Sequence, residues 1–280
     1  MMSAICDMAE PAQRDDAPSG ANIEINETPR LHWLLAYADD ALILGHRLSE
    51  WCARGPSMEE DMALANLGLD LLGQARFLYS HAAMLENAAN PELRRSEDDY
   101  AYRRDAPQFR NTLLVEQPNG DFAATMMRHL LYASFVDLYW RASGAVADPA
   151  IAAFAARSEK ETAYHRRHAA EWVIRLGDGT AESHRRAQAA LDHLLPLADE
   201  VFQPMPGQQS LIDAGMIIDP VHLHDAYRHH IEQVCAQATL KLAWPQSNQT
   251  GGRLGRHSAH LAPLLAELQF LPRTYPGATW

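Results

Sequence analysis

Cysteine is scarce in this chain, and its placement excludes several kinds of protein. The 280 residues contain three cysteines, Cys6, Cys52 and Cys235, which lie far apart and form no Cys-x-x-Cys pair. This spacing provides neither a disulfide framework nor a zinc site, and it suits a reducing cytosol. We expect Cys52 to be a small buried thiol, because no base that would activate it as a nucleophile is evident.

Long apolar runs and a surplus of positive charge are also missing. No stretch reaches the roughly 18 apolar residues needed to span a bilayer, and the first residues lack the basic start and apolar run of a secretory signal. The formal net charge of -12 argues against a nucleic-acid partner, since nothing would neutralise a phosphate backbone. We therefore expect a cytoplasmic protein that binds neither membranes nor nucleic acid.

The remaining composition is that of a globular domain, with 47% hydrophobic and 21% charged residues. Residues 1–30 are rich in Pro, Asp, Glu, Asn and Ala and lack periodicity, so we expect a disordered or loosely attached tail. From residue 31 onward, helix signals follow one another with almost no strand signal between them. This pattern predicts a single helical domain over residues 31–280.

Cap residues and breakers divide this domain into helices. The pattern predicts helices over residues 31–54, 57–87, 121–144, 148–177, 180–201, 219–242 and 258–271. The count favours an all-α fold, with four long helices in a bundle and shorter peripheral ones.

Three features of this division carry most weight. Ser57 and Glu60 have the form of a capping box, and Asp148 and Asp219 each stand before a proline as helix caps. The second helix is apolar nearly all round, so we expect it at the centre of the bundle. Residues 90–120 form a long arginine-rich connection, which is typical of a functional or poorly ordered loop.

The sequence lacks the ligand pattern of a di-iron centre, which four-helix bundles often hold. Such a centre uses a Glu from each of two helices and a Glu-x-x-His from each of the other two. No Glu-x-x-His occurs in the chain, and the only acid between Phe122 and Ser143 is Asp137. We expect neither a metal nor a catalytic residue in this chain.

A polar line in the second helix marks where metal ligands would lie. Asn66, Asp70 and Gln74 follow one another at four-residue spacing. They indicate either a buried hydrogen-bonded network left from a former site, or plain polar residues satisfied by their neighbours.

The helix over 148–177 offers the best metal candidates, Glu161, His165, His168 and Glu171. Glu161 and His165 are spaced to meet one metal, and His165 and His168 also share a face. No partners are evident on the facing helices, so an ion-paired or solvated face is favoured over a metal site.

Six segments form a set that resembles a known family. They are residues 48–52 (LSEWC), 61–76 (DMALANLGLDLLGQAR), 113–122 (LLVEQPNGDF), 250–253 (TGGR), 260–267 (HLAPLLAE) and 276–280 (PGATW). They resemble the structural (C) subunits of bacterial ring-1,2-phenylacetyl-CoA epoxidases, multicomponent monooxygenases of phenylacetate breakdown. The resemblance covers about residues 31–280.

The resemblance implies a ferritin-like fold and a division of labour among subunits. A homologous catalytic subunit would hold the di-iron centre, and this chain would stabilise it without a cofactor of its own. A separate reductase would carry FAD and an iron–sulfur cluster. The missing Glu-x-x-His agrees with this division.

The resemblance also implies contacts with the acyl-CoA substrate from two segments, Gln108, Phe109, Arg110 and Asn111, and Gln209, Ser210 and Leu211. The first keeps the family's Gln-Phe-x-Asn pattern, with Arg110 as a departure, whereas the second shares only its leucine. Amides suit the pantetheine and nearby arginines suit the CoA phosphates. The alternative is that Phe109 and Asn111 anchor the long connection to the bundle.

Three hypotheses remain open from the sequence. The leading one is a non-catalytic partner of a di-iron monooxygenase subunit that also lines its acyl-CoA site. The second is a self-sufficient metalloenzyme that uses Asp70, Glu161, His165 and His168. The third is a free-standing helical scaffold with no link to an oxygenase.

Overall fold

The computed structural model describes residues 22–276 and 278. Within these residues it has eleven α-helices, five short 3-10 helices and no strand. The long helices are α1 (Pro29–Ser49), α2 (Met58–Ala89), α5 (Phe122–Ala142), α6 (Pro149–Gly177), α7 (Ala181–Ala198) and α9 (His224–Gln237). The short ones are α3 (Glu97–Tyr102), α4 (Leu113–Glu116), α8 (Gln208–Asp213), α10 (Leu261–Leu268) and α11 (Phe270–Thr274). The predicted all-α class is confirmed, and none of the described helices is long and apolar enough to cross a membrane.

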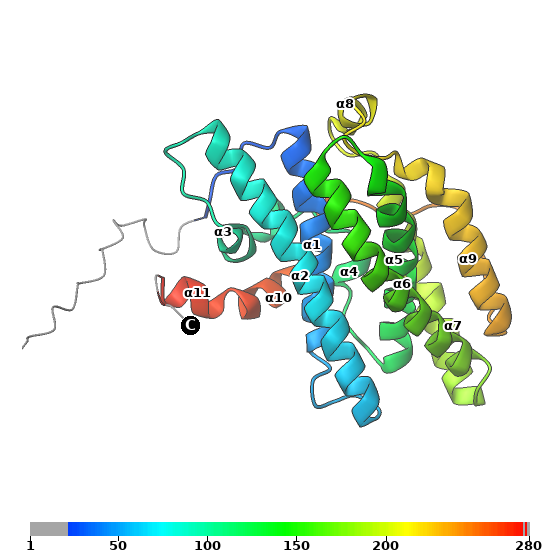
Figure 1. Cartoon of the computed structure of the whole chain (residues 1–280). Helices are drawn as coiled ribbons and strands as arrows, with labels where there is room; N and C mark the ends of the chain where they lie inside the picture. Colours follow the sequence, from blue (N-terminus) through cyan, green and yellow to red (C-terminus); the bar gives the residue numbers. More distant parts are fainter. Residues whose placement is uncertain (1–21, 277, 279–280) are drawn as a thin grey trace, which may run out of the picture.

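Helices α1, α2, α5 and α6 form the expected four-helix bundle (Figure 1). α1 packs along α2, and α5 packs along α6. The two pairs meet through aromatic side chains, because Tyr37 of α1 stacks on Tyr139 of α5 with ring centroids 4.6 Å apart. Trp33 Nε1 also donates to the Tyr139 hydroxyl at 2.9 Å. α7 and α9 pack against α5 from outside, as peripheral helices.

The central helices are α1 and α5 rather than α2. In α1, 17 of 21 residues are buried, and in α5, 16 of 21. In α2 only 11 of 32 are buried, and Met58, Met62, Leu69 and Met84 are exposed. The prediction of a central α2 was wrong, because its apolar residues occupy two faces and the bundle covers one of them.

The predicted helix starts hold at Ser57 and Asp148, whereas Asp219 caps a 3-10 helix (Pro220–Leu223) and α9 begins only at His224. Ser57 Oγ accepts from the backbone N–H of Glu60 at 3.3 Å, and Asp148 Oδ1 accepts from that of Ala150 at 2.9 Å. The Glu60 carboxylate does not complete the capping box but pairs with His168 of α6. The first helix ends at Ser49, five residues earlier than predicted.

Two segments expected to be loose are packed where the structure describes them. Ile23 is buried and its N–H donates to the carbonyl of Arg103, so the packed domain begins before residue 31. Residues 1–21 of the predicted tail lie outside the described residues. The connection over 90–120 contains α3, α4 and a 3-10 turn (Ala106–Gln108), and much of it is buried.

Of the two cysteines that the structure describes, one differs from its predicted burial. Cys52 is exposed in the turn after α1, whereas Cys235 of α9 is buried. The prediction of a buried Cys52 was wrong because α1 ends before this residue and the turn carries it away from the core.

Candidate functional site

A fully buried ion pair fixes the beginning of the candidate segment. Arg104 and Asp39 have no exposed side-chain surface, and the two NH₂ groups of the guanidinium bind the two carboxylate oxygens. Tyr79 of α2 donates to Asp39 Oδ1 at 2.5 Å. Arg104 also donates to the carbonyls of Tyr100 at 2.6 Å and Gln108 at 3.0 Å. The chain after α3 is thereby held against α1 and α2.

The neighbouring carboxylate, Asp40, forms a second buried pair. Its Oδ2 accepts from Arg253 Nη2 at 2.6 Å, and its Oδ1 accepts from the backbone N–H of Thr112 at 2.7 Å. Arg253 Nη1 donates to the carbonyls of Ala36 at 2.7 Å and Arg110 at 2.9 Å. Burial raises the pKa of Asp40 to about 6, although Arg253 and Thr112 oppose this shift. Arg253 therefore connects the candidate segment to α1 through hydrogen bonds to both.

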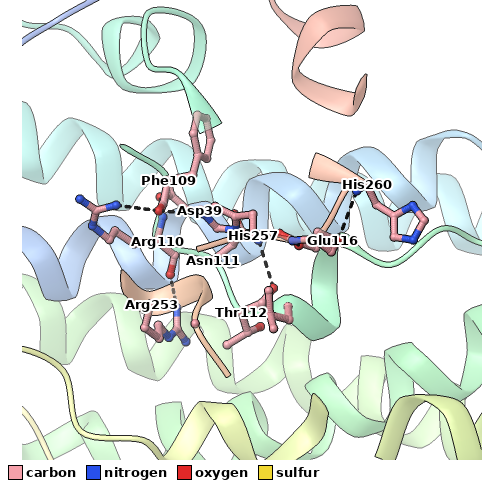
Figure 2. A network of polar contacts seen from close by, with 12 residues as sticks. Asp39, Phe109, Arg110, Asn111, Thr112, Glu116, Arg253, His257 and His260 are labelled. Carbon is pink, nitrogen blue, oxygen red and sulfur yellow. Dashed lines mark hydrogen bonds and ion pairs between the residues drawn. The ribbon is translucent and has the colours of Figure 1, made fainter. Parts of the chain in front are cut away.

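A third buried group completes the network (Figure 2). Glu116 Oε2 accepts from Asn111 Nδ2 at 2.8 Å and lies 2.8 Å from His257 Nδ1. The other ring nitrogen of His257 lies 3.0 Å from the carbonyl of Phe109. Both ring nitrogens of His257 therefore lie within hydrogen-bond distance of an oxygen atom, and the ring joins Glu116 to the backbone of the candidate segment.

The first candidate segment lies inside this network. Phe109 and Asn111 have no exposed surface, and the Arg104 guanidinium lies 4.2 Å from the centroid of the Phe109 ring. The amide of Gln108 accepts from the N–H of Asp105 at 3.0 Å and donates to the carbonyl of Ile23 at 2.8 Å. These contacts favour the anchoring alternative for Phe109 and Asn111.

Arg110 is the member of this segment that reaches a cavity. The cavity has a volume of about 310 Å³ and is lined by Glu27, Pro29, His32, Arg110, Pro206, Gly207 and Leu254. Arg110 binds Glu27 through Nε at 3.2 Å and also through Nη2. Burial acts to raise the pKa of Glu27, but hydrogen bonds from His32 and Arg110 lower it to about 2. The cationic side chain therefore has an anionic partner already.

The second candidate segment lies in α8, directly after this cavity. Gln209 and Ser210 are exposed, whereas Leu211 is buried. Gly207 has a φ of +70°, and a Cβ at this position would overlap the ring of Pro29. Glycine thus permits the close approach of this loop to α1. Arg110 and Gly207, which precedes Gln209 by two residues, line the same cavity. The spacing of the two candidate segments in the sequence did not predict this proximity.

The polar patterns of α2 and α6 face one another. Gln74 Nε2 donates to Glu161 Oε2 at 2.9 Å, and Asp70 Oδ2 lies 3.2 Å from His165 Nε2. Residue Glu60 completes the series, with its Oε2 2.9 Å from His168 Nε2. The expectation that the helix over 148–177 lacks facing partners was therefore wrong, because three of its polar side chains each meet a polar side chain of α2. Asn66 and Glu171 are exposed and take no part in these pairs.

These pairs do not fit a di-iron centre. Each imidazole meets one carboxylate, so carboxylates and imidazoles do not converge on a common point. Among residues 22–276 and 278, no group of three or more His, Cys, Asp and Glu side chains is arranged to hold a metal ion. The ordinary di-iron set needs six convergent ligands. We therefore derive no chemistry through a metal in this chain.

His129 of α5 is a buried group that sequence reasoning missed. Its ring centroid lies 5.2 Å from that of His165, and neither ring nitrogen has a hydrogen-bond partner. Burial, with a smaller contribution from His165, lowers the pKa of His129 well below its usual value. The ring is consequently neutral. A single histidine in an apolar helix forms no spacing pattern with other polar residues, so the sequence did not indicate it.

Comparison with known proteins places the chain in a family. The sequence model of the family described as "Phenylacetic acid catabolic protein" matches residues 15–280. The chain belongs to this family. The match includes all eleven helices and both candidate segments. The chain is also similar to the C subunit of the 1,2-phenylacetyl-CoA epoxidase of Escherichia coli (strain K12), with 41% identity over 249 residues, 89% of this chain and 98% of that protein. The family expected from the six sequence segments is confirmed.

Proposed function

We propose that this chain is a non-catalytic structural subunit of a multicomponent di-iron monooxygenase that epoxidises the ring of phenylacetyl-CoA in aerobic phenylacetate catabolism. The observation that carries the proposal is the similarity to the C subunit of a 1,2-phenylacetyl-CoA epoxidase over 98% of that protein's length. A homologous catalytic subunit would hold the di-iron centre. A separate reductase with FAD and an iron–sulfur cluster would supply electrons. The cysteine usage supports a cytoplasmic location.

The buried carboxylates of the bundle support a structural role. Asp39 and Asp40 have no exposed side-chain surface, and each pairs with a buried arginine, Arg104 or Arg253. Recruiting either carboxylate to a metal would leave its arginine buried without a partner. Breaking a buried pair in this way costs about 3–5 kcal/mol. The interior charges are thus committed to holding the fold.

The cavity beside Arg110 supports the proposed acyl-CoA contact. Its volume of about 310 Å³ accommodates part of such a ligand rather than the whole. Arg110 would exchange Glu27 for an anionic group of the CoA, and Gln209 and Ser210 would offer exposed polar groups nearby. Phe109 and Asn111 would act indirectly, since their buried side chains hold the backbone that carries Arg110.

Iron analysis tests the division of labour. The chain is purified alone and in complex with its catalytic subunit, both from iron-supplied cells, and iron is measured per chain. We expect near zero in the isolated chain and about two per catalytic subunit in the complex, the complement of a di-iron site. About two per isolated chain would instead favour the metalloenzyme hypothesis built on Asp70, Glu161, His165 and His168.

A charge substitution tests the substrate contact. Arg110→Gln should raise the KM for phenylacetyl-CoA in the assembled oxygenase while leaving kcat within about twofold, because a binding interaction is lost equally in ground and transition states. Arg103→Gln is the matched control, since Arg103 forms a partly exposed pair with Asp99. An unchanged KM in Arg110→Gln would contradict the contact.

A further inference from the structure

The outer face of α2 carries long apolar side chains that nothing in the described chain covers. Met58, Met62, Leu69 and Met84 are exposed by 71, 61, 65 and 55%. At 3.6 residues per turn, their positions fall within an arc of roughly 80°. They extend along roughly 39 Å of helix, at a rise of 1.5 Å per residue. Exposed apolar surface of this extent is typical of an interaction site.

A glycine on the same face points to a close approach from outside. Gly73 is exposed in the interior of α2, and a Cβ at this position would have no atom within 4 Å. Glycine is disfavoured in a helix interior relative to alanine. Gly45 and Gly68 have an internal explanation, because α1 and α2 touch there and a Cβ on Gly45 would lie 3.2 Å from the carbonyl of Gly68. Gly73 has no such neighbour within the chain.

The charge beside this face identifies the kind of partner. α6 lies next to α2 (Figure 1), joined to it by the Gln74–Glu161 and Asp70–His165 contacts. The exposed residues of α6 include four cations and one acid, namely Arg157, Lys160, Arg167, Arg175 and Glu171. α2 adds Arg76, which is 76% exposed and pairs with Glu97 of α3, and an exposed acid, Glu59, in its first turn. Arg157 lies 3.9 Å from Glu161 of its own helix, so Lys160, Arg167 and Arg175 are the cations that dominate this face. This basic face stands on a chain with a net charge of -12.

These charges disfavour a second copy of the chain as the occupant. In a two-fold contact the same patch occurs on both sides, so the basic edges would face one another or border a shared seam. A different chain with acidic residues beside an apolar helix complements the patch. Two adjacent helices of about 10 Å width and about 39 Å length present roughly 800 Å², which is the area per partner of a standard specific interface.

We propose that the outer face of α2, with the basic edge of α6, is the surface that docks the homologous catalytic subunit. The contacting element is a helix whose small side chains meet Gly73 and whose apolar side chains meet Leu69 and the methionines. Acidic residues on that helix lie against Lys160 and Arg167. The identity of the partner rests on the proposed function, whereas the surface rests on the geometry of this chain.

The test measures the Kd for the catalytic subunit with variants of the full chain. Leu69→Glu and Gly73→Leu should each weaken binding by at least 100-fold, and both should remain folded because the positions are exposed. Phe270→Glu is the matched control, since Phe270 is a 62% exposed apolar residue on a different helix, α11. It should change Kd by less than threefold. Losses in the α2 variants no larger than in Phe270→Glu would overturn the surface.

Two further readouts separate the alternatives. Lys160→Glu with Arg167→Glu should slow association more than tenfold at low salt and little at high salt, because exposed charges are screened. Sedimentation should show the wild-type chain alone as a monomer; self-association abolished by Leu69→Glu would overturn the proposal in favour of a second copy. If the wild-type chain does not bind the catalytic subunit, the proposed function fails together with the docking surface. If the wild-type chain binds the catalytic subunit and neither Leu69→Glu nor Gly73→Leu weakens this binding, the docking surface alone is refuted.

Discussion

Removal of the Arg104 guanidinium should destabilise the packing of the connection between α3 and α4. Arg104→Met keeps the unbranched stem of the side chain as far as the position of Nε but leaves the Asp39 carboxylate without a cation. Asp39 is fully buried and would retain only two donors, the Tyr79 hydroxyl at 2.5 Å and the backbone N–H of Arg110 at 2.6 Å. Breaking a buried ion pair from one side costs about 3–5 kcal/mol. Because two donors remain, we expect a loss near the lower limit, about 3 kcal/mol.

The loss is measured as the change in the free energy of unfolding from urea denaturation, followed by circular dichroism. A loss of about 3 kcal/mol should also lower Tm by about 6–12 °C. Arg103→Met is the matched control, because the adjacent Arg103 pairs with Asp99 at 3.2 Å one helical turn away, partly exposed. That variant should lose about 0.5 kcal/mol.

A double-mutant cycle isolates the pair itself. Asp39→Asn combined with Arg104→Met should cost less than the sum of the two single changes, with a coupling energy of at least about 2 kcal/mol. Two outcomes would refute the reasoning. One is an Arg104→Met variant no less stable than Arg103→Met, and the other is strict additivity in the cycle.

Three further predictions follow from groups elsewhere in the fold. Burial raises the pKa of Asp40 to about 6 from a value of 3.8, so its contribution to stability should be complete below pH 3.8 and lost as the pH rises to about 6. The difference in urea midpoint between wild type and Asp40→Asn, measured across this range, checks the sign; a difference independent of pH would contradict it. Gly207→Ala should destabilise by about 1–3 kcal/mol through its positive φ alone, and further because the added Cβ would overlap the ring of the proline that opens α1. Gly215→Ala, with a φ of +66° and no atom near the added Cβ, is the control for backbone strain and should be the milder change. Finally, iodoacetamide should modify Cys52 in the native chain and Cys235 only after unfolding, because Cys235 is buried and its pKa is raised to about 11. Peptide mapping of the modified residues gives the result, and equal native labelling would contradict the assigned exposures.

Local sequence was sufficient for most helix starts. Ser57, Asp121 and Asp148 each accept a backbone N–H at the N-terminus of the helix that follows. Cap chemistry acts within three residues, so it is legible without tertiary structure. The predicted end of the first helix was wrong, because α1 ends at Ser49 rather than at residue 54.

The role of α2 depended on information outside its own sequence. Its composition is apolar enough for a core helix, yet Leu69 and Met62 are exposed and Gly73 faces open space. Periodicity records which residues are apolar and not what covers them. A helix face that packs against another subunit and one that packs inside the bundle have the same local pattern of apolar residues.

The sequence by itself determined the helical class, the caps, the family through its characteristic segments, and the absence of Glu-x-x-His spacing. Only the tertiary structure decided the partners of the buried charges. Arg253 reaches Asp40 across 213 residues, and Glu200 accepts from the N–H groups of Leu113 and Gly251. The same is true of the cavity that brings Arg110 close to Gly207. Such pairs form because a charge removed from water requires a partner, and chain folding rather than sequence spacing determines which partner lies within reach.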